Sequence, residues 1–292
     1  MSKDWAEKIA QQLFSRGLMQ KGICLVLGAA DTGKTSLVAA LAKLAASDQP
    51  VGVIDADIGQ SHIGPPTTVG WAVVDSPDVN FSDLPAGGIS FVGDVTPVGH
   101  LLQLTAAIAQ CVRQVSETAR LMIIDTPGLI SGPAAAALWW AVQRILQPEL
   151  ILAVQRSDEL GGILAGLRFF DLKLELVESA PQIPLKSREH RRGYRQSRFC
   201  KYFQDSCLYS VELSKVAVQL ARNLSCGDLV HRVVALRDAG GQDMAIGLVE
   251  DWQNDRDVVV VRAPKINIQQ LHCLVLGDVT IDIAGQGSLG ES

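Results

Sequence analysis

Short, wholly apolar runs alternate with segments of helical apolar spacing from residue 23 to about residue 178. Apolar runs of this length are typical of strands that are buried on both faces. Strands are therefore predicted at residues 23–27, 50–54, 89–93, 121–125 and 150–154. Helices are predicted at residues 5–18, 36–46, 101–119 and 134–146. Strands that alternate with helices predict an α/β fold, with a mostly parallel sheet covered by helices on both faces.

The pattern changes from about residue 206 to Val-rich segments separated by turn residues. Strands are predicted there near residues 227–235, 245–250, 257–261, 271–276 and 279–283. Short strands at this spacing are typical of a small β-barrel or sandwich. A helix over residues 210–223 is predicted to join this part to the α/β domain. We therefore expect an N-terminal helix within residues 1–21, an α/β domain over residues 22–205, and a helix with a β-rich domain over residues 206–292.

The most specific motif follows the first predicted strand. Residues 28–35 read G-A-A-D-T-G-K-T, which matches the phosphate-binding pattern G-x-x-x-x-G-K-[ST], and a helix is predicted directly after them. In such a P-loop, backbone N–H groups turn toward phosphate oxygens, Lys34 would reach the β- and γ-phosphates, and Thr35 would ligate Mg²⁺. The expected nucleotide-binding residues are Gly28, Ala29, Ala30, Asp31, Thr32, Gly33, Lys34, Thr35 and Ser36.

Acidic residues follow two further predicted strands, at the sheet edge where ligands bind in open α/β folds. Asp55 and Asp57 follow the strand at residues 50–54, and one of the two is expected to face the phosphates directly. The alternative is that both carboxylates only cap a turn. Asp125 ends the strand at residues 121–125, as in the second signature of P-loop NTPases, and would hold Mg²⁺ through water. A turn role is again the alternative.

The overall composition is that of a globular protein, with 48% hydrophobic and 20% charged residues. The uncharged stretch 126–143 contains two prolines and two glycines, which suit a loop before a helix better than a membrane span. The charged N-terminus does not resemble a secretion signal, so we expect a cytoplasmic protein with no membrane partner. The six cysteines are scattered without a C-x-x-C pair, which favours free thiols over a metal site.

One segment departs strongly from the net charge of −5, which by itself argues against a nucleic-acid partner. Residues 186–201, called the lid below, carry seven basic residues against one acidic residue, a net charge of +6. The basic residues are Lys186, Arg188, Arg191, Arg192, Arg195, Arg198 and Lys201. The arginines at positions 188, 191, 195 and 198 would share one face of a helix. Such a row is either a solvated surface or a lid that closes over a nucleotide and stabilises the phosphoryl group in transfer.

The P-loop is followed along the chain by D-A-D-I-G-Q at residues 55–60, T-P-G at residues 126–128 and the basic lid. This order of elements resembles that of polynucleotide 5′-hydroxyl kinases. This P-loop family includes RNA kinases of pre-mRNA cleavage, tRNA splicing and ribosomal RNA processing. The resemblance extends from about residue 22 to residue 203, and more weakly beyond. It implies ATP and Mg²⁺ as cofactors and a 5′-hydroxyl end of RNA or DNA as the acceptor.

The resemblance also implies roles for single residues. Asp57 matches the family's acid that activates the 5′-hydroxyl and helps to hold the metal. The implied catalytic residues are Lys34, Asp57, Arg191 and Arg195. The implied metal-holding residues are Thr35, Asp57 and Asp125. The residues expected around the nucleic-acid end are Gln60, Thr96, Thr126, Gly128, Lys186, Arg192 and Arg198.

Two positions depart from the family pattern. Leu129 stands where related RNA kinases often have a Trp that stacks on a base. Base–aromatic stacking contributes about 1–3 kcal/mol per base, so the grip on the terminal nucleotide would be weaker or would come from another residue. Lys186 stands where relatives have a lid arginine, and a lysine supplies charge without a planar fork.

Two other functions fit parts of the sequence. Residues 125–128 also match the D-x-x-G of GTPase switches, but Q-R-S-D follows the strand at residues 150–154, where a guanine-specific switch needs N-K-x-D. The second alternative is a non-catalytic scaffold that holds ATP and binds a processing partner. The intact Lys34 and Asp57 argue against such a scaffold.

Overall fold

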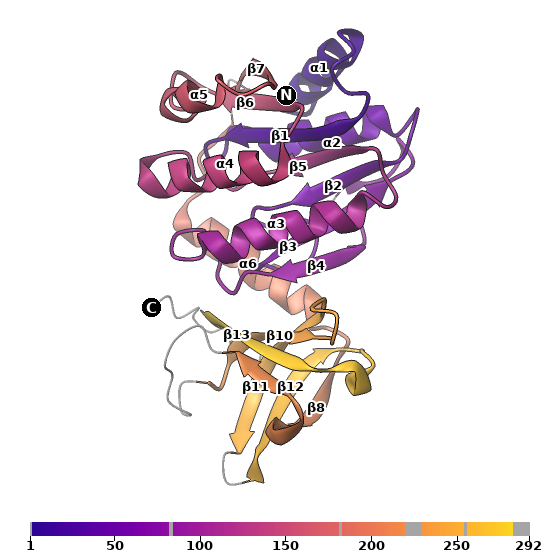
Figure 1. The fold of residues 1–292 in the computed structure, drawn as a ribbon, viewed down its shortest axis with the longest axis vertical. Coiled ribbons are helices and arrows are strands. Elements are labelled where there is room, and N and C mark those ends of the chain that lie inside the picture. The colour runs from indigo at the N-terminus through magenta and orange to yellow at the C-terminus, as the bar shows by residue number, and fades with distance from the viewer. Residues whose placement is uncertain (1, 82–83, 181–182, 220–228, 254–255, 283–292) are drawn as a thin grey trace.

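The computed structural model describes residues 2–81, 84–180, 183–219, 229–253 and 256–282. An α/β part and a smaller all-β part follow each other along the long axis, with helix α6 (Arg188–Tyr202) beside the boundary (Figure 1). Within those residues, no helix has both the length and the apolar character that a membrane span needs.

The α/β part is built on seven strands in the order β7-β6-β1-β5-β2-β3-β4. The strands are β1 (Gly22–Gly28), β2 (Val51–Asp55), β3 (Thr68–Val74), β4 (Gly88–Phe91), β5 (Leu121–Asp125), β6 (Leu150–Gln155) and β7 (Lys173–Glu178). The first five strands in this order run parallel, whereas β3 pairs antiparallel with both β2 and β4. The mostly parallel sheet predicted from the alternation of apolar runs is therefore confirmed.

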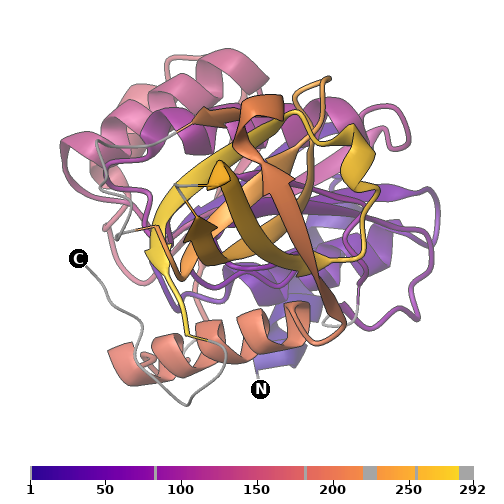
Figure 2. The same ribbon diagram turned by 90° about the horizontal axis from the view of Figure 1, so that it is seen from below.

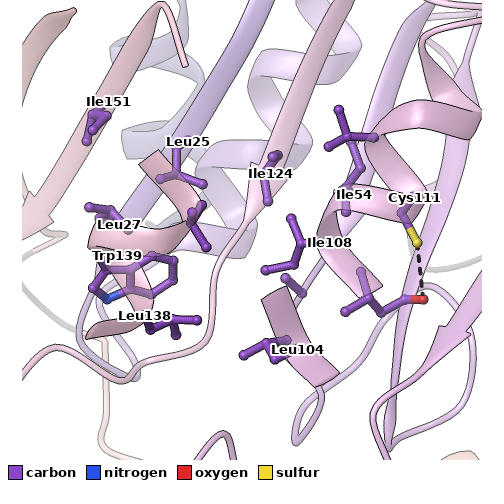
Figure 3. Close-up of a cluster of buried hydrophobic side chains, with 14 of the residues drawn as sticks. Leu25, Leu27, Ile54, Leu104, Ile108, Cys111, Ile124, Leu138, Trp139 and Ile151 are labelled. Atoms are coloured by element: carbon purple, nitrogen blue, oxygen red, sulfur yellow. Dashed lines mark hydrogen bonds between the residues drawn. The ribbon is translucent and has the colours of Figure 1, made fainter. Parts of the chain in front are cut away.

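Helices cover both faces of this sheet, as the sequence predicts. The helices before the lid are α1 (Ser2–Ser15), α2 (Lys34–Ala45), α3 (Leu101–Val115), α4 (Gly132–Leu146) and α5 (Gly161–Leu167). Helices α1 and α2 pack on one face, and α3, α4 and α5 pack on the other. Figure 3 shows how Leu25, Ile54 and Ile124 of the central strands meet Ile108 and Trp139 of α3 and α4. Because these strands are buried on both sides, their carboxyl ends are fixed in space.

The all-β part is one curled sheet in the order β8-β12-β11-β10-β13-β9 among the described residues (Figure 2). Its strands are β8 (Ser206–Glu212), β9 (Ala217–Gln219), β10 (Arg232–Arg237), β11 (Asp243–Gln253), β12 (Val258–Pro264) and β13 (Cys273–Thr280). One face encloses its own apolar core, and the other packs against α6 and β4. The predicted small β domain is confirmed, and its sheet continues that of the α/β part because β11 pairs antiparallel with β4.

Two predictions for this region are wrong. The predicted helix over residues 210–223 is instead β8, a 3-10 turn (Leu213–Lys215) and β9, and residues 220–223 lie outside the described part. Strand β8 pairs with β12 along its whole length, so tertiary pairing overrides the local helical spacing. The strands predicted at residues 271–276 and 279–283 are one continuous strand, β13. Residues 227, 228 and 283 of the predicted strands also lie outside the described part.

Helix α6 is anchored on the all-β part by its C-terminal half. Phe199 is fully buried, and Phe203, just after the helix, is nearly so, among apolar side chains of β10 and β11. Asp243 at the start of β11 links the all-β part to β4 of the α/β part. Its carboxylate accepts the backbone N–H of Phe91 in β4 at 2.7 Å and pairs with Arg237 at 2.7 Å. The N-terminal half of α6 is thereby directed back toward the carboxyl ends of the parallel strands.

Candidate active site

The P-loop connects β1 to α2 with the backbone shape that its glycines permit. Gly33 precedes the helix with φ 95°, a left-handed conformation that glycine adopts without steric cost. Gly28 lies so close to β6 that a Cβ would come 2.5 Å from the carbonyl oxygen of Val154. Lys34 is 6% exposed, and its ammonium group donates to the carbonyl of Ala29 at 2.7 Å. The lysine therefore lies across the loop whose amides would receive phosphate.

Thr35 and Asp125 meet directly below the loop. The Thr35 hydroxyl donates to Asp125 Oδ2 at 2.5 Å. Asp125 Oδ1 is buried, and no hydrogen-bond partner reaches it from the described residues. A hydroxyl and a carboxylate side by side are oxygen ligands of the kind that Mg²⁺ takes in P-loop sites. The two residues therefore fit the metal that the sequence leads us to expect.

Asp55 is a structural residue at the end of β2. Its carboxylate is 2% exposed and accepts the backbone N–H groups of His62 at 2.5 Å, Ile63 at 3.0 Å and Asp57 at 3.1 Å. Three backbone donors on one buried carboxylate hold the following loop in shape. In the sheet register Asp55 stands beside Asp125 of β5, so two buried carboxylates are neighbours here.

Asp57, two residues further on, lines the cavity instead. Its Oδ1 accepts the backbone N–H groups of Gly59 at 3.2 Å and Gln60 at 3.1 Å, which fixes the carboxylate on the loop. Residues two apart in a regular strand point to the same face of the sheet, so the alternation of side chains along a strand does not explain why Asp55 is buried while Asp57 lines the cavity. They diverge because β2 ends at Asp55 and the chain turns after it.

The lid reaches this edge from the other side. Arg191 donates from Nη2 to Asp31 Oδ2 at 2.7 Å, which ties α6 to the P-loop. Lys186, just before the helix, donates from Nζ to Gln60 Oε1 at 3.1 Å, which ties the lid to the loop of Asp57. Two of the basic residues predicted to approach a nucleotide, Lys186 and Arg191, therefore contact the P-loop and the loop of Asp57.

One cavity of about 740 Å³ unites these segments. Its lining includes the predicted residues Ala30, Asp31, Thr32, Gly33, Lys34, Thr35, Ser36, Asp57, Gln60, Lys186 and Arg191. They come from three stretches of chain that lie up to 161 positions apart. A volume of this size accommodates a nucleotide-sized ligand.

Three predicted lid residues lie elsewhere along α6. Arg198 donates from Nη2 to the carbonyls of His62 at 2.7 Å and Gly64 at 2.8 Å, so it clamps the loop that follows Asp57. Arg195 is 9% exposed and lies within the protein, and Arg192 is exposed. Of the four arginines predicted to share one helical face, Arg188 is exposed, and those at positions 191, 195 and 198 each meet a different environment.

Three other predicted residues surround the site without lining the cavity. The Thr126 hydroxyl donates to the carbonyl of Val26 at 2.7 Å and thus joins β5 to β1. Gly128 lies against the P-loop, where a Cβ would come 2.6 Å from the nitrogen of Ala30. Thr96 is exposed in the turn that begins at Asp94, whose carboxylate accepts its backbone N–H at 3.0 Å.

The comparison with protein families agrees with this geometry. A family model for the P-loop of mRNA cleavage and polyadenylation factor CLP1 matches residues 28–205, from the first glycine of the P-loop through the lid. The chain belongs to the CLP1 P-loop family. Over the same region, the resemblance to polynucleotide kinases noted in the sequence is confirmed.

Curated relatives of this CLP1 P-loop protein include archaeal enzymes. A polyribonucleotide 5′-hydroxyl-kinase of Pyrococcus abyssi is 33% identical over 195 residues, which is 66% of this chain and 54% of the relative. One of Pyrococcus horikoshii is 30% identical over 214 residues, 73% of this chain and 56% of the relative. The chain thus spans about half the length of the curated relatives it matches.

A solved structure of wild-type Clp1p in complex with Pcf11p shares the fold, with a TM-score of 0.71 at 14% sequence identity. The match covers 94% of this chain and 77% of that one. The likeness therefore extends beyond the P-loop domain into the all-β part, and it concerns the fold.

Burial sets the electrostatics of the site in this CLP1 P-loop protein. Burial lowers the pKa of Lys34, against the carboxylates of Asp125, Asp57 and Asp31, which favour its charged form. Burial, together with the negative charge of Asp55, raises the pKa of Asp125 to about 7, and the charge of Lys34 opposes this rise. The buried charges of the site are therefore not fully balanced by one another, and a bound ion or phosphate would balance them.

Residues from outside the recognised motifs complete the cavity. Trp5 of α1 packs against the P-loop at Gly33, and its indole N–H donates to the carbonyl of Glu178 at 3.1 Å. Ile183 and Pro184 add apolar surface beside it. The sequence marks Trp5 only as part of an amphipathic helix, because no motif indicates that α1 folds against α2 and reaches the P-loop.

Proposed function

We propose that this protein is an ATP-dependent polynucleotide 5′-hydroxyl kinase that transfers the γ-phosphoryl group of ATP to the 5′-hydroxyl of RNA. The observation that carries the proposal is the convergence of Lys34, Asp57 and Arg191 on one cavity. These are a phosphate-binding lysine, a carboxylate and a lid arginine, which together suit phosphoryl transfer to an alcohol. The name polyribonucleotide 5′-hydroxyl-kinase, borne by the relatives, supports RNA as the acceptor.

Asp57 accepts the proton of the attacking hydroxyl. The two backbone hydrogen bonds to its side chain end on Oδ1, which leaves Oδ2 for that proton. The P-loop amides and Lys34 hold the nucleotide's phosphates, and Arg191 stabilises the charge on the group in transfer. Thr35 and Asp125 would hold Mg²⁺, which would neutralise part of the phosphate charge.

The nucleotide base occupies the apolar end of the cavity. Trp5, Ile183 and Pro184 supply that surface, beside the start of α2. An aromatic ring and aliphatic side chains are suited to pack against the faces of a purine. A base bound there leaves the phosphates on the P-loop. The sequence after β6 does not carry the guanine-reading motif, and Arg156 there donates instead to the carbonyl of Asp31. Adenine is therefore the proposed base.

The test is transfer of labelled phosphate from ATP to a panel of acceptors. The panel contains single- and double-stranded RNA and DNA with 5′-hydroxyl ends, the same oligonucleotides with 5′-phosphates, free nucleosides and small sugars. We expect incorporation only into 5′-hydroxyl polynucleotides, with RNA preferred. No incorporation into any polynucleotide would refute the proposal, and preferred labelling of nucleosides or sugars would replace it with a metabolite kinase.

Two controls separate the rival functions. GTP in place of ATP is expected to support transfer poorly, whereas tight GTP binding without transfer would favour a nucleotide switch. ATP turnover is expected to rise when a 5′-hydroxyl oligonucleotide is added. ATP that binds but is never consumed, with or without an oligonucleotide, would favour the non-catalytic scaffold.

A further inference from the structure

Asp31 occupies an unfavourable place in the P-loop. It is one of the non-glycine residues with a left-handed backbone, at φ 58°. Its side chain is 6% exposed and lines the cavity that is proposed to receive phosphate. A carboxylate there would repel an anionic ligand, so it requires a compensating interaction. The left-handed backbone is one that Asp tolerates better than most residues with a Cβ.

The compensation comes from the lid. Asp31 Oδ2 accepts from the guanidinium of Arg191 at 2.7 Å and from the backbone N–H of Lys186 at 2.9 Å. These donors lie 155 and 160 positions further along the chain. Asp31 also receives a hydrogen bond from Arg156 on its carbonyl oxygen, which fixes the backbone of the loop. One buried carboxylate thus joins the start of the lid, the lid helix and the P-loop.

We propose that Asp31 is a positioning residue that docks the lid on the P-loop and holds Arg191 over the phosphate to be transferred. This inference rests on the proposed kinase function for its catalytic consequence. The contact with Asp31 uses one of the five N–H donors of Arg191, and Nε donates to the carbonyl of Lys186 at 3.4 Å, so the other N–H groups of the same guanidinium can reach a phosphate oxygen while it stays docked. The charge of Arg191 also offsets the repulsion between Asp31 and the nucleotide.

The role of Asp31 differs from that of Asp57. Asp57 accepts hydrogen bonds only from its own loop among the hydrogen bonds described for its side chain, and it stays available to the acceptor hydroxyl. Asp31 is engaged by the lid, so it does not serve as a base. Loss of Asp31 should therefore lower the rate of the chemical step but not weaken the binding of ATP, because a negative charge is removed from the phosphate site.

The first experiment needs no kinase activity. Trypsin is applied to the nucleotide-free protein, and cleavage within residues 186–192 is followed by mass spectrometry for wild type, Asp31→Asn and Asp75→Asn. Asp75 is an exposed acid after β3, at the opposite edge of the sheet, and is the matched control. We expect cleavage in the lid to be at least about fivefold faster in Asp31→Asn and unchanged in the control. Equal cleavage in all three proteins would overturn the docking role.

A second variant covers the case in which Asp31→Asn does not fold, as judged by circular dichroism. Arg191→Met breaks the same contact from the lid side and should expose the lid equally, which is judged by cleavage after Lys186, Arg188 and Arg192 because the variant lacks the site at position 191. The double exchange Asp31→Arg with Arg191→Asp should restore part of the protection. Protection that stays at the wild-type level in Arg191→Met, or that does not return in the exchange, would count against the ion pair as the docking contact.

The catalytic consequence is tested by a double-mutant cycle in the kinase assay. Asp31→Asn should lower kcat about tenfold while the KM for ATP is unchanged or lower. In an Arg191→Met background, Asp31→Asn should lower kcat only slightly further, because the arginine that Asp31 positions is already absent. Independent, multiplying losses, or a raised KM for ATP, would show a local structural role instead. If wild type phosphorylates no acceptor, the proposed function fails, and the trypsin result still decides whether Asp31 docks the lid.

Discussion

The two halves of the site are held in place by different forces. The half at the sheet edge, with Lys34, Thr35 and Asp125, follows strands that are buried on both faces. The half contributed by the lid, with Lys186 and Arg191, lies at and just before the partly exposed start of α6, and it meets the P-loop and the loop of Asp57 through one ion pair and hydrogen bonds. Packing therefore fixes the first half, and charge positions the second. Substitutions in the sheet-edge half should therefore act on the chemical step, and substitutions in the lid half should act on positioning.

The largest expected loss comes from the sheet-edge half. Asp57→Asn keeps the size of the side chain and can still accept the N–H groups of Gly59 and Gln60, but it cannot accept the hydroxyl proton. We expect kcat to fall about 10²–10⁴-fold, the contribution typical of a general base. Transfer of labelled phosphate to a 5′-hydroxyl RNA measures it. Asp75→Asn is the control, and near-normal transfer by Asp57→Asn would remove Asp57 from the mechanism.

The lid half should show a smaller and graded loss. Arg191→Ala removes the guanidinium, and we expect kcat to fall about 10²-fold, as when one charge-stabilising donor is lost. Arg191→Lys keeps the charge without the planar fork and should recover part of the rate. Arg113→Ala, an exposed arginine of α3, is the matched control. Equal rates for Arg191→Lys and Arg191→Ala would show that geometry, and not charge alone, decides the contribution.

The same division explains what the sequence can predict. The P-loop, Asp57 and Asp125 are recognisable because each directly follows or borders an apolar strand, and strand ends of a parallel sheet meet at one edge. The row of lid arginines is recognisable from its helical spacing. The separate environments of these arginines are not recognisable from the sequence. The contacts of Arg198 with the loop after Asp57 and of Arg191 with Asp31 depend on how α6 is anchored.

The all-β part shows the limit for elements without a motif. Residues 206–212 form a strand only because β12 lies beside them, and this pairing joins positions about 50 residues apart. Helical spacing in the sequence carries no information about such a partner. The sequence does not predict the role of Trp5 for a similar reason, since its place in the cavity follows from the packing of α1 on α2.

The base end of the cavity should affect ATP binding, in contrast to the phosphate end, which should affect the rate of transfer. Trp5→Ala removes the aromatic surface beside the P-loop without removing a charge. We expect the KM for ATP to rise about tenfold, the effect of losing roughly 1–2 kcal/mol of stacking, with kcat nearly unchanged. Trp5→Phe should retain most of the affinity. Titration of a fluorescent ATP analogue gives the binding constant directly, and an unchanged constant in Trp5→Ala would place the base elsewhere.

The smallest expected effect is a dependence of stability on pH, and it belongs to the sheet-edge half. Burial raises the pKa of both Asp55 and Asp125 to about 7, from 3.8, and the negative charge of Asp57 adds to the rise for Asp55 as that of Asp55 does for Asp125. Between these values the folded state binds a proton that the unfolded state has released, so the free energy of unfolding falls as pH rises from about 4 to about 7. Since ionisation of one carboxylate opposes ionisation of the other, we count one proton, and the slope is at most about 1.4 kcal/mol per pH unit.

Urea unfolding at pH 5, 6 and 7 without nucleotide or Mg²⁺ measures this slope. His62 acts in the opposite direction, because burial lowers its pKa below 6.5 and its contribution to stability grows as pH rises toward that value. Comparison with Asp125→Asn isolates the carboxylate pair, since His62 is present in both proteins. The variant should lose most of the fall in stability between pH 5 and pH 7. An identical slope in both proteins would mean that the two buried acids do not share a proton, and that packing alone sets the sheet-edge half of the site.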